Sequence, residues 1–310
     1  MVYIAEGKVL CYTEISANVM DFGAKGDGTT DDTAAIQAAI NSCKDSGGLI
    51  YFPTGTYIVT ASLLVYSNQM LFGKPGAVIK QGAAITNLMM TYCASDTTGY
   101  NGTHDVVICG LTFDGGSYTT NNTLLGTVHA KNITISNCIF KNAYGEWHDV
   151  EINSTYNCKI VNCDFEGARH TNSSACLIQV DALNNEATWP WGSNRGSVDG
   201  TISKYVEISS CIFHDSEVAP AIGNHSTVSS ESVRVHDCIF VGFTSNRGAI
   251  EFWAAGYVDV YNCVFETCKY GVSSATATFF IYGNRFTVTA TAYGSSAIAH
   301  GNIVNGTYEA

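Results

Sequence analysis

The chain has 310 residues, of which only 14% are charged, and its formal net charge is −12 at pH 7. This acidic balance argues against a nucleic-acid partner, because phosphates are bound by clustered Lys and Arg. No stretch is long and apolar enough to predict a membrane span, and no signal peptide is visible at the start. A cytoplasmic, a virion-associated and an exported location all stay open.

The first predicted elements are a helix and two short strands. Thr30 or Asp31 can cap the helix, and apolar residues recur at helical spacing from Ile36 to Cys43. Gly47 and the glycine after it end the helix, and the runs LIYFP and TYIV that follow are typical of strands. A stack of β-coils would expose its apolar core at an open end, so we interpret the helix as a cap.

A phrase that predicts a strand followed by a bend recurs seven times between residues 104 and 286. Each copy has apolar residues two apart, often an Asn or Asp in the bend, and a final Phe. The final residues are Phe113, Phe140, Phe165, Phe213, Phe240, Phe265 and Phe286. They are separated by 27, 25, 48, 27, 25 and 21 residues. A strand that repeats at such intervals indicates a parallel β-solenoid whose coils lie about 4.8 Å apart.

The repeat also predicts the domain organisation. We expect one β-helix domain over 1–310, with the cap and first strands in 17–59 and regular coils over 104–304. The interval of 48 residues contains an ordinary coil plus a loop excursion at 182–203. Five of the seven copies carry Cys two residues before the Phe, and a thiol in that register is expected to pack as a small, reduced, apolar side chain.

These segments resemble the pectate-lyase-like superfamily of right-handed parallel β-helix proteins. The resemblance rests on DFGAKGDGTTDDTAAIQAAI, on GGLIYFPTGTY and on the stacked V-x-I-x-x-C-x-F coils. It is strongest to the branch of phage tailspike depolymerases and bacterial polysaccharide-cleaving enzymes. It implies an all-β, single-stranded right-handed parallel β-helix that acts on a polysaccharide, and the phage members imply a homotrimer. The paired Asp of polygalacturonases and the Arg-x-Pro-x-x-Arg pattern of calcium-dependent pectate lyases are not found, so no catalytic residue is carried over.

A second strand is predicted in each coil, and its outward side chains form two columns. Side chains alternate along a strand, so the neighbours of the apolar core residues point outward. One column contains Glu151, Gln179, Gly223 and Glu251. The other contains His129, Asn153, Asp181, His225 and Trp253. Since carboxylates, imidazoles, amides and an indole meet here in a chain that is otherwise poor in charge, we expect a glycan-binding groove.

Two cleavage mechanisms fit these columns. Hydrolysis needs an acid and a second carboxylate, and the candidates are Glu151, Asp181 and Glu251. Elimination beside a uronate needs a base, which His129 or His225 could supply, while Ca²⁺ or the amides of Gln179, Asn153 and Asn224 neutralise the uronate. The preferred interpretation is hydrolysis, with no cofactor and no metal. A third interpretation is a non-catalytic glycan-binding or phage tail structural protein. Trp253, with Trp189, Trp191 and Arg195 of the excursion, is expected to contact the glycan.

Overall fold

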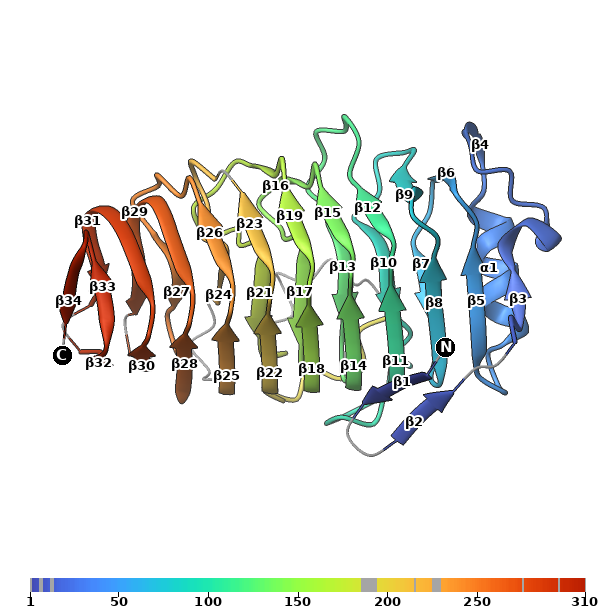
Figure 1. The fold of residues 1–310 in the computed structure, drawn as a ribbon. Coiled ribbons are helices and arrows are strands. Elements are labelled where there is room, and N and C mark those ends of the chain that lie inside the picture. Colours follow the sequence, from blue (N-terminus) through green and yellow to red (C-terminus); the bar gives the residue numbers. More distant parts are fainter. Residues whose placement is uncertain are drawn as a thin grey trace.

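The computed structural model describes residues 2–5, 8–11, 14–184, 194–214, 216–224, 230–274, 276–294 and 296–309. Over these residues the chain forms a right-handed parallel β-solenoid of about 10 turns. The turns stack side by side from the N-terminal end, where α1 lies, to β33 and β34 at the other end (Figure 1).

Two long sheets run the length of the solenoid. One contains β3 (Ala17–Asn18), β5 (Gly48–Phe52), β8 (Gln69–Gly73), β11 (His104–Cys109), β14 (Lys131–Ser136), β18 (Tyr156–Val161), β22 (Lys204–Ser209), β25 (Glu231–His236), β28 (Tyr257–Tyr261), β30 (Thr278–Tyr282) and β32 (Ile298–His300). We call it the first sheet.

The second sheet consists of two ladders of strands. The front ladder contains β7 (Leu63–Val65), β10 (Asn87–Thr91), β13 (Thr123–Thr127), β17 (Val150–Asn153), β21 (Ile178–Asp181), β24 (Ile222–Asn224), β27 (Gly248–Phe252) and β29 (Val264–Ser274). The rear ladder contains β6 (Gly55–Val59), β9 (Ala77–Gln81), β12 (Thr112–Asp114), β15 (Ile139–Lys141), β19 (Asp164–Glu166), β23 (Ile212–His214), β26 (Ile239–Val241), the same β29, and β31 (Arg285–Tyr293). β4 (Asp27–Asp31), β33 (Asn302–Val304) and β34 (Thr307–Glu309) complete this sheet, and two small pairs, β1 (Val2–Ala5) with β2 (Lys8–Cys11) and β16 (Tyr144–Gly145) with β20 (Arg169–His170), lie outside it.

The predicted Phe column is the centre of the core. From Phe113 to Phe286 the seven rings stack at centroid distances of 5.1, 5.0, 4.8, 4.9, 4.7 and 4.5 Å, and all are fully buried. The column continues toward the N-terminus through Ile79, which pairs in register with Phe113, and then through Tyr57, which pairs with Ile79. Regular coils therefore begin well before residue 104, because Ile and Tyr fill the buried site that Phe fills later.

The bends between the strands explain the recurring Asn and Asp. Asn137, Asn162, Asp237 and Asn262 all have φ between 53° and 55°. This left-handed conformation is disfavoured for most side chains but tolerated by Asn and Asp. The Nδ2 of Asn162 donates to the Oδ1 of Asn137 on the preceding coil at 2.6 Å, so the bends also bond to each other.

The predicted helix is present as α1 (Thr33–Ser42), after the short 3₁₀ helix η1 (Val19–Phe22). Its buried residues are Ile36, Ala39 and Ile40, and it contacts η1, β3 and β7. The prediction of Thr30 or Asp31 as the cap is wrong, because the N-cap residue is Asp32 and its side chain makes no capping hydrogen bond. The Oδ1 of Asp31 accepts the backbone N–H of Thr33 at 3.0 Å. That α1 caps the solenoid stays a prediction. No helix in the described ranges has the length and apolar character needed to cross a membrane.

The eleven cysteines from Cys43 to Cys268 are all buried and none of them forms a disulfide. Those of the repeated phrase lie next to the Phe column, and Cys138, Cys211 and Cys238 direct their thiols at backbone carbonyl oxygens. Burial raises the pKa of Cys158 to about 12. These thiols are core side chains.

Candidate functional site

The first predicted outward column is present on the front ladder. Glu151 pairs in register with Gln179, Gln179 with Gly223, and Gly223 with Glu251. The column continues to Ser273, which pairs with Glu251. The apolar neighbours Val150, Ile152, Ile178 and Val180 lie in the core, as the alternation predicts.

Four side chains on β17 and β21 form a compact group that we call the carboxyl–amide quartet: Glu151, Asn153, Gln179 and Asp181. Glu151 lies opposite Gln179 and Asn153 lies opposite Asp181, so each carboxyl group has an amide beside it and across from it. Asn153 Nδ2 donates to Glu151 Oε1 at 3.4 Å, and Gln179 Nε2 donates to Asp181 Oδ2 at 2.9 Å. All four residues are at most 6% exposed.

The quartet raises the proton affinity of Glu151. Burial, and after it the negative charge of Asp181, raise the pKa of Glu151 to about 8, while the hydrogen bond from Asn153 opposes the shift. At neutral pH Glu151 is therefore mostly a protonated acid. Strand geometry places their Cα atoms about 8 Å apart, one strand spacing across and two residues along.

The amide oxygen of Gln179 is an unused acceptor in the quartet. Among the described residues, Gln179 Oε1 has no hydrogen-bond partner, although the side chain is fully buried. A buried polar atom without a partner is costly, and a ligand hydroxyl could satisfy it. The orientation of this amide is fixed by its donation to Asp181.

Glu251, the third candidate carboxylate, is held by donors on all sides. Its oxygens accept from Arg247 at 2.7 Å, Trp253 Nε1 at 3.3 Å, Ser273 Oγ at 3.1 Å and the backbone N–H of Gly248 at 3.2 Å. Trp253 is 37% exposed and the Arg247 guanidinium lies 5.3 Å from its ring centre, so Glu251 holds an aromatic and cationic surface in place.

His129 does not join the second column. Thr127 pairs with Ile152, so β13 ends before His129, whose φ is 47°. The imidazole is fully buried, with Nδ1 at 2.6 Å from the Gly99 carbonyl oxygen and Nε2 at 2.9 Å from the Ser197 carbonyl oxygen. Since carbonyl oxygens only accept, the ring links two loops and has no nitrogen left to act as a base.

Asn224 was expected to offer its amide to the glycan, but it occupies an inward position. It lies at the strand position of Val180 and pairs with Phe252. Its Nδ2 donates to the Ala254 carbonyl at 2.6 Å, and its Oδ1 accepts from the backbone N–H groups of Trp253 and Ala254. The amide therefore shapes the turn that carries Trp253.

Asp149, which alternation predicts to point outward, is instead completely buried. It lies 3.2 Å from Nε2 of His170, whose side chain is also buried. Burial raises the pKa of Asp149, and the contact with His170 opposes the shift. The pair lies inside the corner before β17, so it is not part of the outward column.

The returning end of the loop excursion lies against the segment 91–100. Asn194 Oδ1 accepts from the backbone N–H of Cys93 at 2.8 Å, and Asp199 Oδ2 accepts from that of Gly99 at 2.8 Å. Arg195 lies in this half-buried return. Trp189, Trp191 and His225 lie outside the described residues.

Sequence reasoning missed Arg247 and Ser273 as partners of Glu251. Ser273 is at the next position of the same column, so alignment of the coils could have found it. Arg247 precedes its strand, and no periodic signal marks it.

Comparison with known proteins gives a family for this architecture. A family model described as rhamnogalacturonase A/epimerase, pectate lyase-like, matches residues 16–294. The plasmin and fibronectin-binding protein A of Streptococcus pneumoniae is 29% identical over 255 residues, which are 71% of this chain and 35% of that protein. The chain thus spans about a third of the length of that relative.

Solved structures share the fold at low sequence identity. PfbA, a surface adhesin of S. pneumoniae, has a TM-score of 0.70 at 21% identity, covering 93% of this chain and 78% of that one. An exopolygalacturonase from Thermotoga maritima has a TM-score of 0.66 at 15% identity, covering 90% and 76%. One relative is an adhesin and the other an enzyme, so the fold does not choose between these roles.

Proposed function

Because the chain belongs to the rhamnogalacturonase A/epimerase family of pectate-lyase-like proteins, we propose that it hydrolyses glycosidic bonds of a polysaccharide at the carboxyl–amide quartet. The observation that supports this best is the buried Glu151, whose pKa is raised to about 8, next to Asp181 on the adjacent coil. A glycosidase needs one protonated carboxyl group as the acid and a second carboxyl group as the base.

In the proposed reaction Glu151 donates its proton to the glycosidic oxygen as the bond to the anomeric carbon breaks. Asp181 accepts a proton from the water whose oxygen bonds to that carbon. We assign the inverting reaction, in which a sugar and a water lie between two carboxyl groups about 6.5–9.5 Å apart. Each carboxyl group ends in the opposite protonation state, and exchange with solvent restores both.

The amides and the neighbouring aromatic surface would position the sugar. Asn153 and Gln179 hold the two carboxyl groups, and Gln179 Oε1 can accept from a sugar hydroxyl. Trp253, held by Glu251, would stack on a sugar two coils away from β21 along the front ladder. This assigns Glu251 a positioning role rather than proton transfer.

The second candidate is a non-catalytic binding module. It is favoured by the match to a pneumococcal adhesin over 71% of the chain. In that case the quartet would be a buried polar network that fixes the register of β17 and β21. Elimination is less well supported, because the imidazole of His129 is occupied by two backbone carbonyls.

The test is incubation with neutral and uronate-containing polysaccharides, with and without Ca²⁺. New reducing ends would be followed together with the ultraviolet absorbance of an unsaturated uronate. The proposal predicts reducing ends without that absorbance and without a need for Ca²⁺. Absorbance would establish elimination, and binding without any product across the panel would establish the adhesive role.

A further inference from the structure

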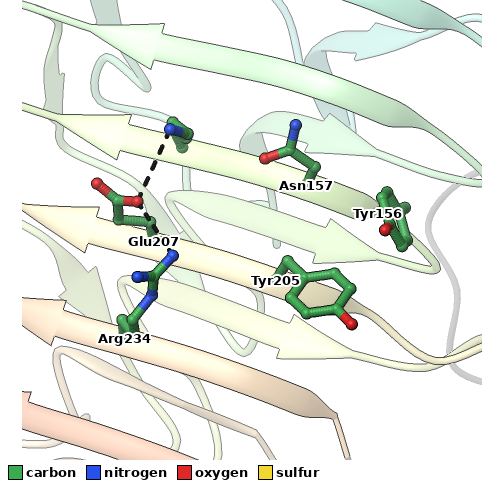
Figure 2. A pocket seen from close by; sticks show the side chains of 6 residues that line it. Tyr156, Asn157, Tyr205, Glu207 and Arg234 are labelled. Carbon is green, nitrogen blue, oxygen red and sulfur yellow. Dashed lines mark ion pairs between the residues drawn. The ribbon is translucent and has the colours of Figure 1, made fainter. Parts of the chain in front are cut away.

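A pocket lies on the first sheet, away from the front ladder. It has a volume of about 240 Å³ and opens on β18, β22 and β25 (Figure 2). The side chains that line it are Tyr156, Asn157, Lys159, Tyr205, Glu207 and Arg234. The proposed cleavage does not use any of them.

Tyr205 has a left-handed backbone conformation. The residues at the same position of the neighbouring coils are of types that tolerate this conformation better. Its φ is 55°, and the equivalent positions on adjacent coils, also at positive φ, are Asp105, Asn132, Asn157 and Ser232. Small polar residues tolerate this region, whereas a bulky aromatic residue in it is an outlier. Backbone strain of this kind is concentrated at functional sites. Since the Tyr205 side chain is 44% exposed, core packing does not explain why Tyr is used here.

The charged side chains of the pocket form only long ion pairs with each other. Lys159, Glu207 and Arg234 are consecutive in register, and Glu207 lies 3.8 Å from Lys159 Nζ and 3.6 Å from Arg234. Both distances exceed a normal hydrogen bond. Among the described residues neither cation makes a side-chain hydrogen bond, so their donors are available to a ligand. Two cations and one carboxylate line the pocket, and Asp259 lies in register beside Arg234 outside the lining.

Two aromatic rings form one side of the pocket. Tyr156 and Tyr205 meet edge to face, with ring centres 5.1 Å apart, and Tyr156 is 38% exposed. Exposed aromatic rings beside charged donors suit a ligand that has both an apolar face and polar substituents. A pyranose ring with a negatively charged group has this combination.

We propose that this pocket binds an anionic sugar residue of a polysaccharide, with the ring against Tyr205 and the carboxylate or sulfate on Arg234 and Lys159. The site binds the polymer without cleaving it. This proposal depends on the proposed function in one respect, which is that the ligand is a polysaccharide. The competing explanation is that Lys159, Glu207, Arg234 and Asp259 are a column of alternating charges that stabilises the sheet.

The test is calorimetric titration with an oligogalacturonate, its methyl ester and a sulfated galactan oligosaccharide. The variants are Tyr205→Asn, which suits the backbone conformation, and Arg234→Ala, with Arg285→Ala as a charge-matched control on β31. Arg285 is an exposed arginine that pairs with Glu266 and lies outside the pocket. Thermal unfolding of each variant is measured in parallel.

We expect Tyr205→Asn and Arg234→Ala to weaken binding of the free acid by about tenfold or more, and Arg285→Ala to leave it unchanged. Tyr205→Asn should unfold at the same or a higher temperature than the wild type, which a structural role for the ring would not give. Preference for the oligogalacturonate or for the sulfated oligomer identifies the anionic group. Wild-type binding by both pocket variants, or equal binding of the methyl ester, would overturn the proposal. If the wild type binds the oligosaccharide at this pocket but cleaves no polysaccharide, the proposed function alone is rejected.

Discussion

Between about pH 4.5 and pH 8 the folded protein keeps a proton on Glu151 that the unfolded chain releases. Replacing Glu151 by Gln removes this difference. The pKa of Glu151 is raised from its ordinary value of 4.5 to about 8, chiefly by burial. Between these two values the folded state binds more protons, so the free energy of unfolding falls as pH rises, by about 1.4 kcal/mol per pH unit. Over the whole interval the loss is on the order of 5 kcal/mol, and above about pH 8 it is complete.

Urea unfolding at about pH 5 and about pH 7.5 measures this loss. We expect the wild type to lose about 3 kcal/mol more than Glu151→Gln between the two conditions. Glu166→Gln, which removes an exposed carboxyl group, is the matched control and should follow the wild type. Asp181→Asn should reduce the loss, because the charge of Asp181 contributes to the shift. Parallel pH curves for the wild type and Glu151→Gln would refute the assignment of a buried, protonated Glu151.

Substitutions at Gly223, Phe213 and Asn162 test the architecture, and chemical denaturation measures the effect of each. Gly223→Ala should destabilise the protein strongly, because the added Cβ would collide with the backbone carbonyl oxygen of Glu251. The control Gly294→Ala has open space at its Cβ and should be nearly neutral. Equal effects of the two substitutions would contradict this packing. Phe213→Ala should cost about 3–5 kcal/mol because it interrupts the ring stack, and a loss below 1 kcal/mol would argue against that stack. Asn162→Ala should cost about 1–2 kcal/mol and Asn162→Gly less, since only glycine avoids the left-handed penalty; the reverse order would be inconsistent with the bend.

The repeated phrase predicted the stacked coils because a buried site that recurs once per turn selects the same residue each time. Phe113 and its equivalents were visible for this reason. Ile79 and Tyr57 fill the same site with other side chains, so the N-terminal coils were not recognised as part of the repeat. Residues 297–302 also read as the second strand of the last coil, but Ile298–His300 pairs with β30 on the first sheet.

The candidate site was predictable where strand alternation holds and not where the chain leaves the strand. Glu151, Gln179 and Glu251 lie where the alternation places them. His129 follows the end of β13 in a left-handed conformation, so alternation could not place it. The elevated proton affinity of Glu151 depends on burial by segments distant in sequence, which no local pattern contains.

The pocket on the first sheet could have been found from the sequence. Lys159, Glu207 and Arg234 each precede the second apolar residue of a repeated phrase. Alignment of the outward positions, and not only of the core positions, shows them as one column. At the position of Tyr205 the neighbouring copies carry Asn157 and Ser232, and a Tyr recurs only at Tyr257, two copies later.

Cleavage and glycan binding by Glu151→Gln and Asp181→Asn, compared with the wild type and Glu166→Gln on one polysaccharide, test the central claim most directly. The account predicts that both quartet variants lose about 100-fold or more in kcat, since each removes a proton-transfer group, while binding stays within a few-fold. Glu166→Gln should cleave normally. Wild-type cleavage by either quartet variant would contradict the assignment of the acid and the base.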